Sequence, residues 1–358
     1  MLSILDKYII RKFLSTYFFM LAIIMLLAMV FDIAERMSEF IQNQATIGAI
    51  FTEYYLNFLV YYGNTYSSMI VFIAVIWFTA KMAQETEIIP ILNSGRPFNR
   101  FLRPYIIAAT LIMMISLIMN HFILPRSNKV RLDFEERYYR NAHHVEDYHA
   151  EYPGNRVVYY SSYNGSDNLI NDFVVEKWNN NKRIVYFLKA RTAQNVPGTN
   201  KWILNDYYEK HFTKDGDEII EGRRKEVQYD FTLEDMAARD NVVESLTYGE
   251  LKKYIKRERS KGSKNIPTFE IELYQRTALP FATYVLTIIG VAVASRKKRG
   301  GIGVNMAIGL GITFVYIFAM KVMAVAAVNV GLPSVIAVWV PNVMFAGIAF
   351  ILYRNAVR

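Results

Sequence analysis

Cysteine is absent from the 358 residues of this chain, and so is any phosphate-binding loop of the form GxxxxGK[ST]. Without cysteine the protein forms no disulfide, so each domain has to be held together by packing, and thiol chemistry says nothing about the compartment. Without the phosphate loop, the chain is not expected to hydrolyse nucleotide by itself. The energy for any transport therefore has to come from a gradient or from a partner protein.

Charge is missing from long stretches of the sequence. No Asp, Glu, Lys or Arg occurs in residues 13–31, 54–80, 104–125, 277–295, 300–320 and 334–353. A helix needs roughly 20 apolar residues to cross the hydrocarbon core of a bilayer. The mean hydropathy of the whole chain is only +0.13 because a polar segment dilutes these stretches. The pattern predicts a polytopic α-helical membrane protein with six transmembrane helices.

One polar segment, residues 126–270, separates spans one to three (residues 1–125) from spans four to six (residues 271–358). Within it, short stretches rich in Val, Ile, Tyr and Phe alternate with turn clusters of Asn, Gly, Pro and Asp. These stretches are residues 156–162, 171–178, 183–190, 201–212 and 226–233. Their spacing favours an inserted all-β domain, a sandwich or jelly roll, with flanking helices over residues 128–144 and 246–263.

Basic residues gather on one side of the predicted spans. With a cytoplasmic N-terminus, the inner side holds Lys7, Arg11, Lys12, Lys81, Arg96, Arg100, Arg103, Arg296, Lys297, Lys298, Arg299, Arg354 and Arg358. The short outer loops offer only Arg36. The positive-inside rule then puts both termini in the cytoplasm and the β domain outside the cytoplasmic membrane, with the first helix uncleaved. The net charge of +9 thus reflects topology, and nucleic acid is not an expected partner.

The polar segment lacks the chemistry of an active site. His143, His144 and His149 lie close together, but no cysteine supports them and their spacing fits no standard metal site. No nucleophile, base and orienting group occur at recognisable spacing. We therefore expect no catalytic residue, no metal site and no cofactor bound by this chain.

The cytoplasmic loop over residues 81–103 is the place where a cytosolic partner could couple. It begins with a helical pattern near residues 82–94, carrying Glu85 and Glu87 ahead of the aliphatic residues Ile88, Ile89, Ile91 and Leu92. A short helix of this kind lying on the membrane can dock into a groove of a cytosolic subunit. The alternative is an ordinary interfacial connector, and composition does not separate the two.

Charged residues at the edges of the spans are the next candidates, because charge is costly in lipid and is usually functional there. Lys321 lies inside span five, where it faces the bundle interior or extends to the outer surface. Glu272 and Arg276 are four residues apart at the start of span four and can pair on one helix face. Asp32 and Arg36 lie at the outer end of span one. Together these residues could line the outward mouth of a cavity.

Several stretches resemble a known family. They are "LDKYIIRKFL", "AQETEIIPILNSG", "ELYQRTALPFATYVLTIIGVAVASRKKRGGIG" and "GLPSVIAVWVPNVMF", the last followed by the C-terminal "YRNAVR". They are similar to the LptF/LptG (YjgP/YjgQ) permeases of lipopolysaccharide export, and the resemblance covers nearly the whole chain. The sequence "TEIIPIL…RPFNRFLRPY" most resembles that of an LptG of the Bacteroidota type.

The resemblance implies a function and a set of partners. It implies a permease heterodimer with an LptF-like chain in the inner membrane, an LptB-like ATPase dimer that supplies the ATP and Mg chemistry, and an LptC-like single-span jelly-roll protein. The complex would pass lipopolysaccharide to a periplasmic bridge. The family's coupling glutamate falls on Glu87, with Glu85 an additional acid, and Pro90 interrupts the coupling helix. A wide apolar cavity would draw on residues such as Phe314 and Phe318.

Two other classes remain open from the sequence. A gradient-driven secondary transporter would show paired halves or broken helices with buried carboxylates, and the spans contain almost none. A membrane-anchored receptor with an outer β sensor would need a cytoplasmic signalling domain, and the cytoplasmic segments are too short for one. We therefore expect the permease subunit of an ABC-type lipopolysaccharide exporter, without a nucleotide site of its own.

Overall fold

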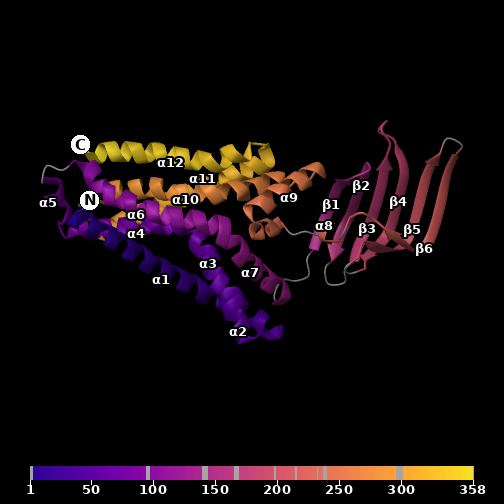
Figure 1. The fold of residues 1–358 in the computed structure, drawn as a ribbon, viewed down its shortest axis with the longest axis horizontal. Coiled ribbons are helices and arrows are strands. Elements are labelled where there is room, and N and C mark those ends of the chain that lie inside the picture. The colour runs from indigo at the N-terminus through magenta and orange to yellow at the C-terminus, as the bar shows by residue number, and fades with distance from the viewer. Residues whose placement is uncertain are drawn as a thin grey trace. The chain divides into compact units, whose positions relative to one another are not determined.

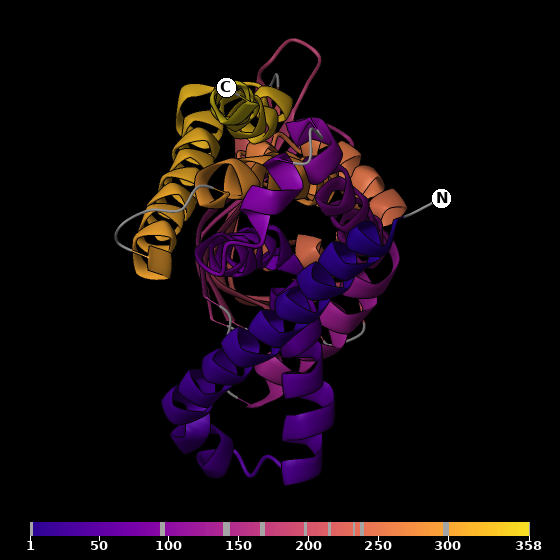
Figure 2. The ribbon, with the colours of Figure 1, turned by 90° about the vertical axis from the view of Figure 1, so that its left-hand side faces the viewer.

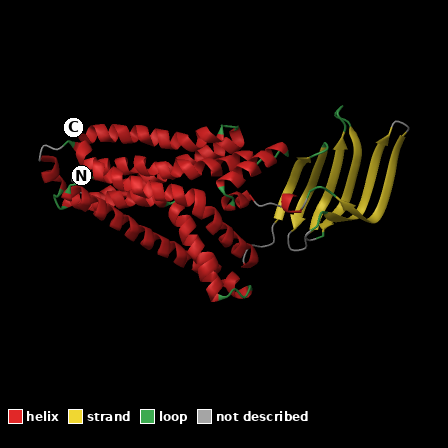
Figure 3. Ribbon diagram, in the orientation of Figure 1, coloured by secondary structure: helices red, strands yellow, loops and turns green. Residues whose placement is uncertain are grey.

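The chain forms two compact units, one helical and one built on a β-sheet (Figures 1 and 3). The computed structural model describes residues 3–93, 97–138, 144–164, 169–196, 199–213, 216–231, 233–236, 240–295 and 301–357. The helical unit comprises Met1–Phe134, Glu244–Leu251 and Pro267–Arg358, and the β unit comprises Glu135–Val243 and Lys252–Ile266.

Among the residues that the structure describes, six helices or helix runs are long and apolar enough to cross a membrane, which confirms the six predicted spans. They are Ile4–Gln42, Ser67–Gln84, Phe98–Tyr138, Ile266–Ala294, Gly301–Val330 and Ser334–Ala356. The helical elements are α1 (Ile4–Gln42), α2 (Ile47–Ala49), α3 (Leu56–Thr65), α4 (Ser67–Gln84), α5 (Ile88–Asn93), α6 (Phe98–Ile118), α7 (Leu124–Tyr138), α9 (Tyr248–Ser260), α10 (Ile266–Ala294), α11 (Gly301–Val330) and α12 (Ser334–Val357). Two π-helical segments, η1 (Ile50–Tyr55) and η2 (Met119–Ile123), precede α3 and join α6 to α7.

The second predicted span is broken, whereas the charge-free run over residues 54–80 suggested one helix. Helix α3 ends at Thr65, and α4 begins at Ser67 after Tyr66, whose backbone has φ −93° and ψ 5°. Gly63 and Asn64 come just before the break, and both residue types weaken a helix. Helix α3 runs beside α1 and away from α4 (Figure 1). The second span therefore contains a joint.

Helix α1 packs into the bundle chiefly over its first half. Ile9, Phe13 and Tyr17 are buried and spaced four residues apart, so they form one stripe on the helix. The Phe13 ring lies 5.6 Å from Phe78 of α4, which stacks on Tyr105 of α6. The C-terminal part of α1 diverges from the other long helices (Figure 2).

Helices α4 and α10 form the centre of the bundle and have little room for larger side chains. An added Cβ at Gly290 of α10 would lie 2.9 Å from Val75 of α4. An added Cβ at Gly309 of α11 would lie 2.4 Å from the Cδ1 atom of Ile76 on α4. Small residues at these positions let helix backbones approach closely, which is a common way to pack helices in a membrane.

The β unit contains one antiparallel sheet in which sequence neighbours are also spatial neighbours. Its strands are β1 (His144–Tyr152), β2 (Arg156–Asn164), β3 (Leu169–Trp178), β4 (Ile184–Asn195), β5 (Lys201–Thr213) and β6 (Gly216–Gln228). The inserted all-β domain is thus confirmed, and its described strands form a single meander with hairpin connections. Short helical segments, α8 (Leu233–Met236) and η3 (Asp240–Ser245), follow the sheet. Buried aromatic residues, including Phe173, Trp202 and Phe231, form its core.

Two sequence expectations for the flanks of the sheet had different outcomes. The helix expected over residues 246–263 is present as α9. The helix expected over residues 128–144 is present as α7 but ends at Tyr138, and β1, which the sequence did not predict, begins at His144. Strand β1 was missed because its apolar residues are separated by Glu146, Asp147 and His149.

A transverse row of residues, running across the sheet, interrupts the pairing between neighbouring strands in all six strands. The residues of this row, one from each strand in order, are Asp147, Ser161, Asp172, Arg191, Asp206 and Arg223. The three aspartates have φ values near +50°. The buried positions change phase across the row, as in β5, where Trp202 and Leu204 are followed by Glu209. The row therefore lets both halves of each strand face the same core, although the side-chain alternation is broken.

Candidate functional site

The connection between α4 and α5 contains a sharp break in the helix. Thr86 has φ 59°, in the left-handed region, and the Glu87 N–H donates to the Met82 carbonyl at 2.9 Å. The helix expected near residues 82–94 is therefore two elements, because a left-handed residue cannot continue a right-handed helix. Pro90 is the third residue of α5, where its missing N–H costs no helical hydrogen bond. It therefore does not interrupt the helix.

Glu85 and Glu87 have different surroundings although they are two residues apart. Glu85 is exposed and has only the weak i, i+4 pair with Lys81 at 3.8 Å. The Glu87 carboxylate instead accepts a hydrogen bond from the Tyr8 hydroxyl at 3.1 Å and lies 3.5 Å from Lys12 Nζ, both on α1. Lys12 Nζ also donates to the Tyr8 hydroxyl at 2.9 Å. Of the two acids, Glu87 is therefore the one that links α5 to the first span.

A second, buried ion pair fixes the start of α1. Arg100 of α6 donates from both terminal nitrogens to the two carboxylate oxygens of Asp6, at 3.0 and 2.9 Å. Asp6 and Ser3 also form a reciprocal capping box at the first turn of α1. The Asp6 side chain is only 3% exposed. This bidentate pair holds the beginning of α1 against α6.

An apolar groove of about 270 Å³ runs between α1, α3 and α6. It is lined by Tyr17, Phe18, Leu21, Leu56, Leu59, Val60, Gly63, Asn64, Ser67, Ile112, Ile115, Ser116 and Met119. The Tyr17 hydroxyl and the Ser67 hydroxyl share a hydrogen bond of 2.7 Å beside the groove. The lining is therefore suited to hydrocarbon rather than to a polar solute.

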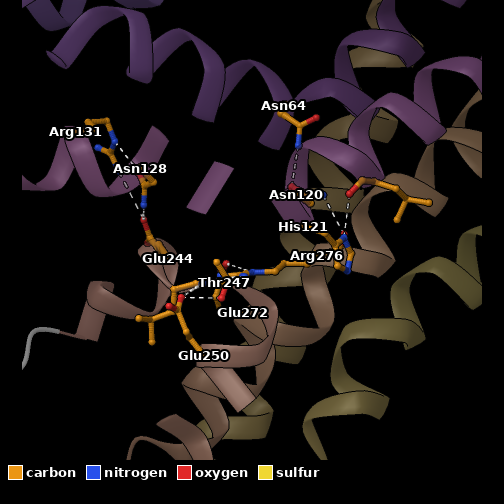
Figure 4. Close-up of polar contacts among 12 residues, drawn as sticks. Asn64, Asn120, His121, Asn128, Arg131, Glu244, Thr247, Glu250, Glu272 and Arg276 are labelled. Carbon is orange, nitrogen blue, oxygen red and sulfur yellow. Dashed lines mark hydrogen bonds and ion pairs between the residues drawn. The ribbon is translucent and has the colours of Figure 1, made fainter. Parts of the chain in front are cut away.

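A polar cluster centred on Arg276 lies among the helices (Figure 4). The buried Arg276 guanidinium donates to Glu272 at 3.3 Å and to the Leu246 carbonyl at 2.7 Å. The Arg276 carbonyl accepts from Asn120, which accepts in turn from Asn64 of α3. The pairing of Glu272 with Arg276 is as expected from the sequence, and the other contacts join α3, η2 and α10.

A second group in the same view joins α7 to the chain segment before α9 (Figure 4). Asn128 donates to Glu244 at 3.1 Å, and Arg131 lies 3.7 Å from the same carboxylate. The Arg131 guanidinium also lies over the rings of Tyr61 and Tyr62. These contacts fix the segment Glu244–Leu251 within the helical unit.

Asp32 and Arg36 of α1 bond to side chains of α1 itself and of η1. The Asp32 carboxylate accepts hydrogen bonds from the hydroxyls of Tyr54 and Tyr55, both at 3.2 Å, and from Arg36. Arg36 also lies 3.7 Å from Glu39. The structure therefore ties this part of α1 to η1.

Lys321, Phe314 and Phe318 form a separate group on α11. Phe314 and Phe318 are 70% and 61% exposed in the single chain, and their rings stack at 6.4 Å. Lys321 is exposed as well. Among the described residues, no contact joins this group to Arg36 or to Arg276. The predicted site residues thus fall into separate places in this chain.

Sequence reasoning missed several residues of these clusters. Lys12 gave only a charge signal and Tyr8 gave none, and Asn64 and Asn120 are single amides in apolar runs. A buried amide in a span could have served as a signal, because such groups need a partner in lipid. Among the described residues, no three potential ligands are close enough to hold a metal ion. His143 and the side chain of His144 lie outside that part.

Comparison with known proteins decides the family. The model of the lipopolysaccharide export system permeases LptF/LptG matches residues 7–355. The chain belongs to the LptF/LptG family. A separate comparison with curated proteins found no match. As a member of this family, it is a multi-pass inner-membrane permease of lipopolysaccharide export and is not itself catalytic.

Proposed function

We propose that this LptF/LptG permease is an LptG-type subunit of an ABC-type exporter that extracts lipopolysaccharide from the inner membrane. The observation that carries the proposal is the family match over residues 7–355, which includes the inserted β unit and all six spans. The natural lipid passes to a periplasmic bridge toward the outer membrane. The motif around "TEIIPIL" supports the LptG assignment over LptF.

The proposed orientation places both termini in the cytoplasm and the β unit in the periplasm. Basic residues flank the spans mainly on the side of the termini. The N-terminal end of α1, the C-terminal end of α12 and α5 lie at the same end of the helical unit (Figure 1). This arrangement supports α5 as a cytoplasmic element that is within reach of a cytosolic subunit.

The proposed partners are an LptF-like permease, an LptB-like ATPase dimer and an LptC-like single-span β protein. ATP and Mg act in the ATPase, since this chain has no phosphate loop. In this assembly Glu87 couples hydrolysis to transport through α5, with Glu85 in a lesser role. The placement of Glu87 at the break before α5, bonded to α1, supports this assignment.

The apolar groove and the outer charges are the proposed lipid path. The groove between α1, α3 and α6 suits acyl chains, and Phe314 and Phe318 on α11 offer a further apolar surface. Arg36, Arg276 and Lys321 are the cationic candidates for lipid phosphates. Because Arg36 and Arg276 already have carboxylate partners, Lys321 is the cation whose described surroundings show no ion pair.

The break at Tyr66 is a feature that fits a gradient-driven transporter, in which unwound helices coordinate ions. In this chain the Tyr66 N–H donates to the Tyr62 carbonyl at 3.0 Å, so the turn is closed by its own backbone. The described residues hold no carboxylate cluster at this joint. We therefore retain lipid export driven by a partner ATPase.

The test of the proposed function is Glu87→Arg in the assembled complex in proteoliposomes. We expect the complex to assemble but to move at least tenfold less lipopolysaccharide per ATP hydrolysed, because the coupling carboxylate is replaced by the opposite charge. Glu85→Arg should have a smaller effect. Lys7→Glu, an equally large charge change at an exposed position of α1, is the matched control and should export normally. Unimpaired export by the Glu87→Arg complex would refute the assignment.

A further inference from the structure

The contacts of Glu87 identify α1 as the element that α5 controls. Tyr8 and Lys12 are separated from Glu87 by 79 and 75 residues in the chain, yet both contact its carboxylate. The two α1 residues lie one helical turn apart, and they also bond to each other at 2.9 Å. Three side chains therefore form one small network between the first span and the junction that precedes α5.

This network differs in kind from the neighbouring Asp6–Arg100 pair. Asp6 is buried and receives two parallel hydrogen bonds, so removing one partner would leave an uncompensated charge. The side chains of Lys12 and Glu87 are 22% and 34% exposed, and their separation is 3.5 Å. Partly exposed pairs of this kind contribute little to stability and exchange easily. The buried pair is thus the stronger anchor of α1, whereas the Glu87 network is the weaker contact.

Helix α1 can transmit a tilt about its anchored first turn over a long distance. It is continuous over 39 residues, which corresponds to about 58 Å at 1.5 Å per residue. The groove residue Tyr17 lies five residues beyond Lys12. Farther along, Asp32 bonds to Tyr54 and Tyr55, and the Phe40 ring packs against Tyr54. The outer part of α1 is therefore joined to η1 and α3 as one arm. This arm also contacts α7, where Phe134 packs against Phe40 and Tyr54 and Arg131 lies over Tyr61 and Tyr62.

The joint between α3 and α4 allows that arm, together with α7, to tilt relative to α4. The arm contributes one wall of the groove through Phe18, Leu21 and Leu59, and α6 contributes the other through Ile112 and Met119. The helical break at Tyr66 lies where the arm meets α4. A rotation about this joint changes the width of the groove without unfolding either helix.

We propose that Tyr8 and Lys12 are positioning residues that tie the α5 junction to the α1–α3 arm, so that movement of α5 changes the width of the groove. This inference rests on the proposed function of Glu87 and deepens it, because it names the element to which the motion is passed. Tyr8 and Lys12 need not contact the ATPase or the lipid. They act by holding the Glu87 carboxylate against α1.

The experiment uses the assembled complex with Tyr8→Phe, Lys12→Gln and the double variant. The isosteric Tyr8→Phe change removes one hydroxyl only, so it provides a test even if Lys12→Gln fails to assemble. We expect about three- to tenfold less lipopolysaccharide released per ATP in the double variant, the range that follows from losing a partly exposed pair and a hydrogen bond. Lys12→Arg should restore most of the release. Arg11→Gln is the matched control, because Arg11 is exposed on the same turn, and it should change nothing.

A second measurement separates positioning from a merely structural role. Spin labels at Leu26→Cys of α1 and Leu111→Cys of α6, both exposed in this chain, report the distance between the arm and α6. This chain has no native cysteine, so within it the labels are specific, and the partner subunits should be cysteine-free. We expect the distance to change between nucleotide-free and vanadate-trapped complexes, and this change to be lost in the double variant.

The outcomes distinguish this proposal from the function on which it rests. Normal release per ATP and a normal distance change in the double variant would overturn the proposal for Tyr8 and Lys12. If Glu87→Arg is uncoupled in the same assay, the proposed function still stands in that case. If Glu87→Arg exports normally, the assignment of Glu87 itself fails, whatever the double variant does.

Discussion

Gly309→Ala tests the packing of the bundle at the contact between α11 and α4. The added Cβ would lie 2.4 Å from Ile76 Cδ1, and the next closest atoms are Ile76 Cγ1 and Cγ2 at 3.7 and 3.8 Å. A single terminal methyl group thus causes the whole clash. Ile76 is 1% exposed and part of a buried cluster, so its side chain has little room to turn away.

The expected magnitude is the difference of two effects. Overpacking a close-packed core costs about 1–3 kcal/mol. Replacing glycine by alanine inside a helix stabilises by up to about 1 kcal/mol, because alanine loses less backbone entropy on folding. Gly309→Ala should therefore lower the free energy of unfolding by about 0–3 kcal/mol. Ile76→Val removes Cδ1 and costs about 0.5–1.5 kcal/mol by itself.

The double variant gives the sharpest result. The Ile76→Val change removes the clashing methyl group, so Gly309→Ala in that background should stabilise by up to about 1 kcal/mol. The interaction energy of the pair is then about 1–3 kcal/mol. The assay is equilibrium unfolding of the purified chain in mixed micelles, followed by tryptophan fluorescence. Gly311→Ala is the matched control, since no atom lies within 4 Å of its added Cβ. Its effect on the free energy of unfolding should be the same in the native and the Ile76→Val backgrounds.

The reasoning would be refuted if the free-energy changes of Gly309→Ala and Ile76→Val were additive. If the two changes add to within about 0.5 kcal/mol, the contact between Gly309 and Ile76 does not set the approach of α11 to α4. A Gly309→Ala variant that behaves like Gly311→Ala in the native background would lead to the same conclusion. Either result would also remove the argument that small residues set the spacing of these helices.

Two further predictions concern the other polar features. Arg276→Met should lower the free energy of unfolding by about 3–5 kcal/mol in the same assay, because it leaves Glu272 and the Leu246 carbonyl without their donor; a loss below about 1 kcal/mol would contradict the cluster. Asp147, in the transverse row, has φ 51°. Asp147→Gly should leave the stability unchanged, whereas Asp147→Val should cost about 1–2 kcal/mol and speed amide exchange in β1 and β2 of the full chain. Equal exchange in the two variants would contradict a strained position.

The sequence alone determined the number of spans and the presence of the inserted β domain. Both depend on the local content of the chain: a run without charge can cross lipid, and clusters of Val, Ile, Tyr and Phe between turn residues form strands. The pairing of Glu272 with Arg276 was predictable for the same reason, because residues four apart share a helix face. The family also followed from short motifs, whereas the coupling role that they suggest for Glu87 stays a prediction.

The tertiary structure decided the rest, because it depends on residues that are distant in the chain. The break at Thr86 lies in a segment whose composition favours a helix, and Gly63 and Asn64 before Tyr66 only weaken a helix, so local patterns did not locate either break. The transverse row shifts the side-chain alternation at one position in every strand, which weakens the period-two signal that strand prediction uses. The partners of Glu87 lie 79 and 75 residues away on α1. Only folding brings these groups within hydrogen-bonding distance, and the mechanism proposed for α1 depends on that contact.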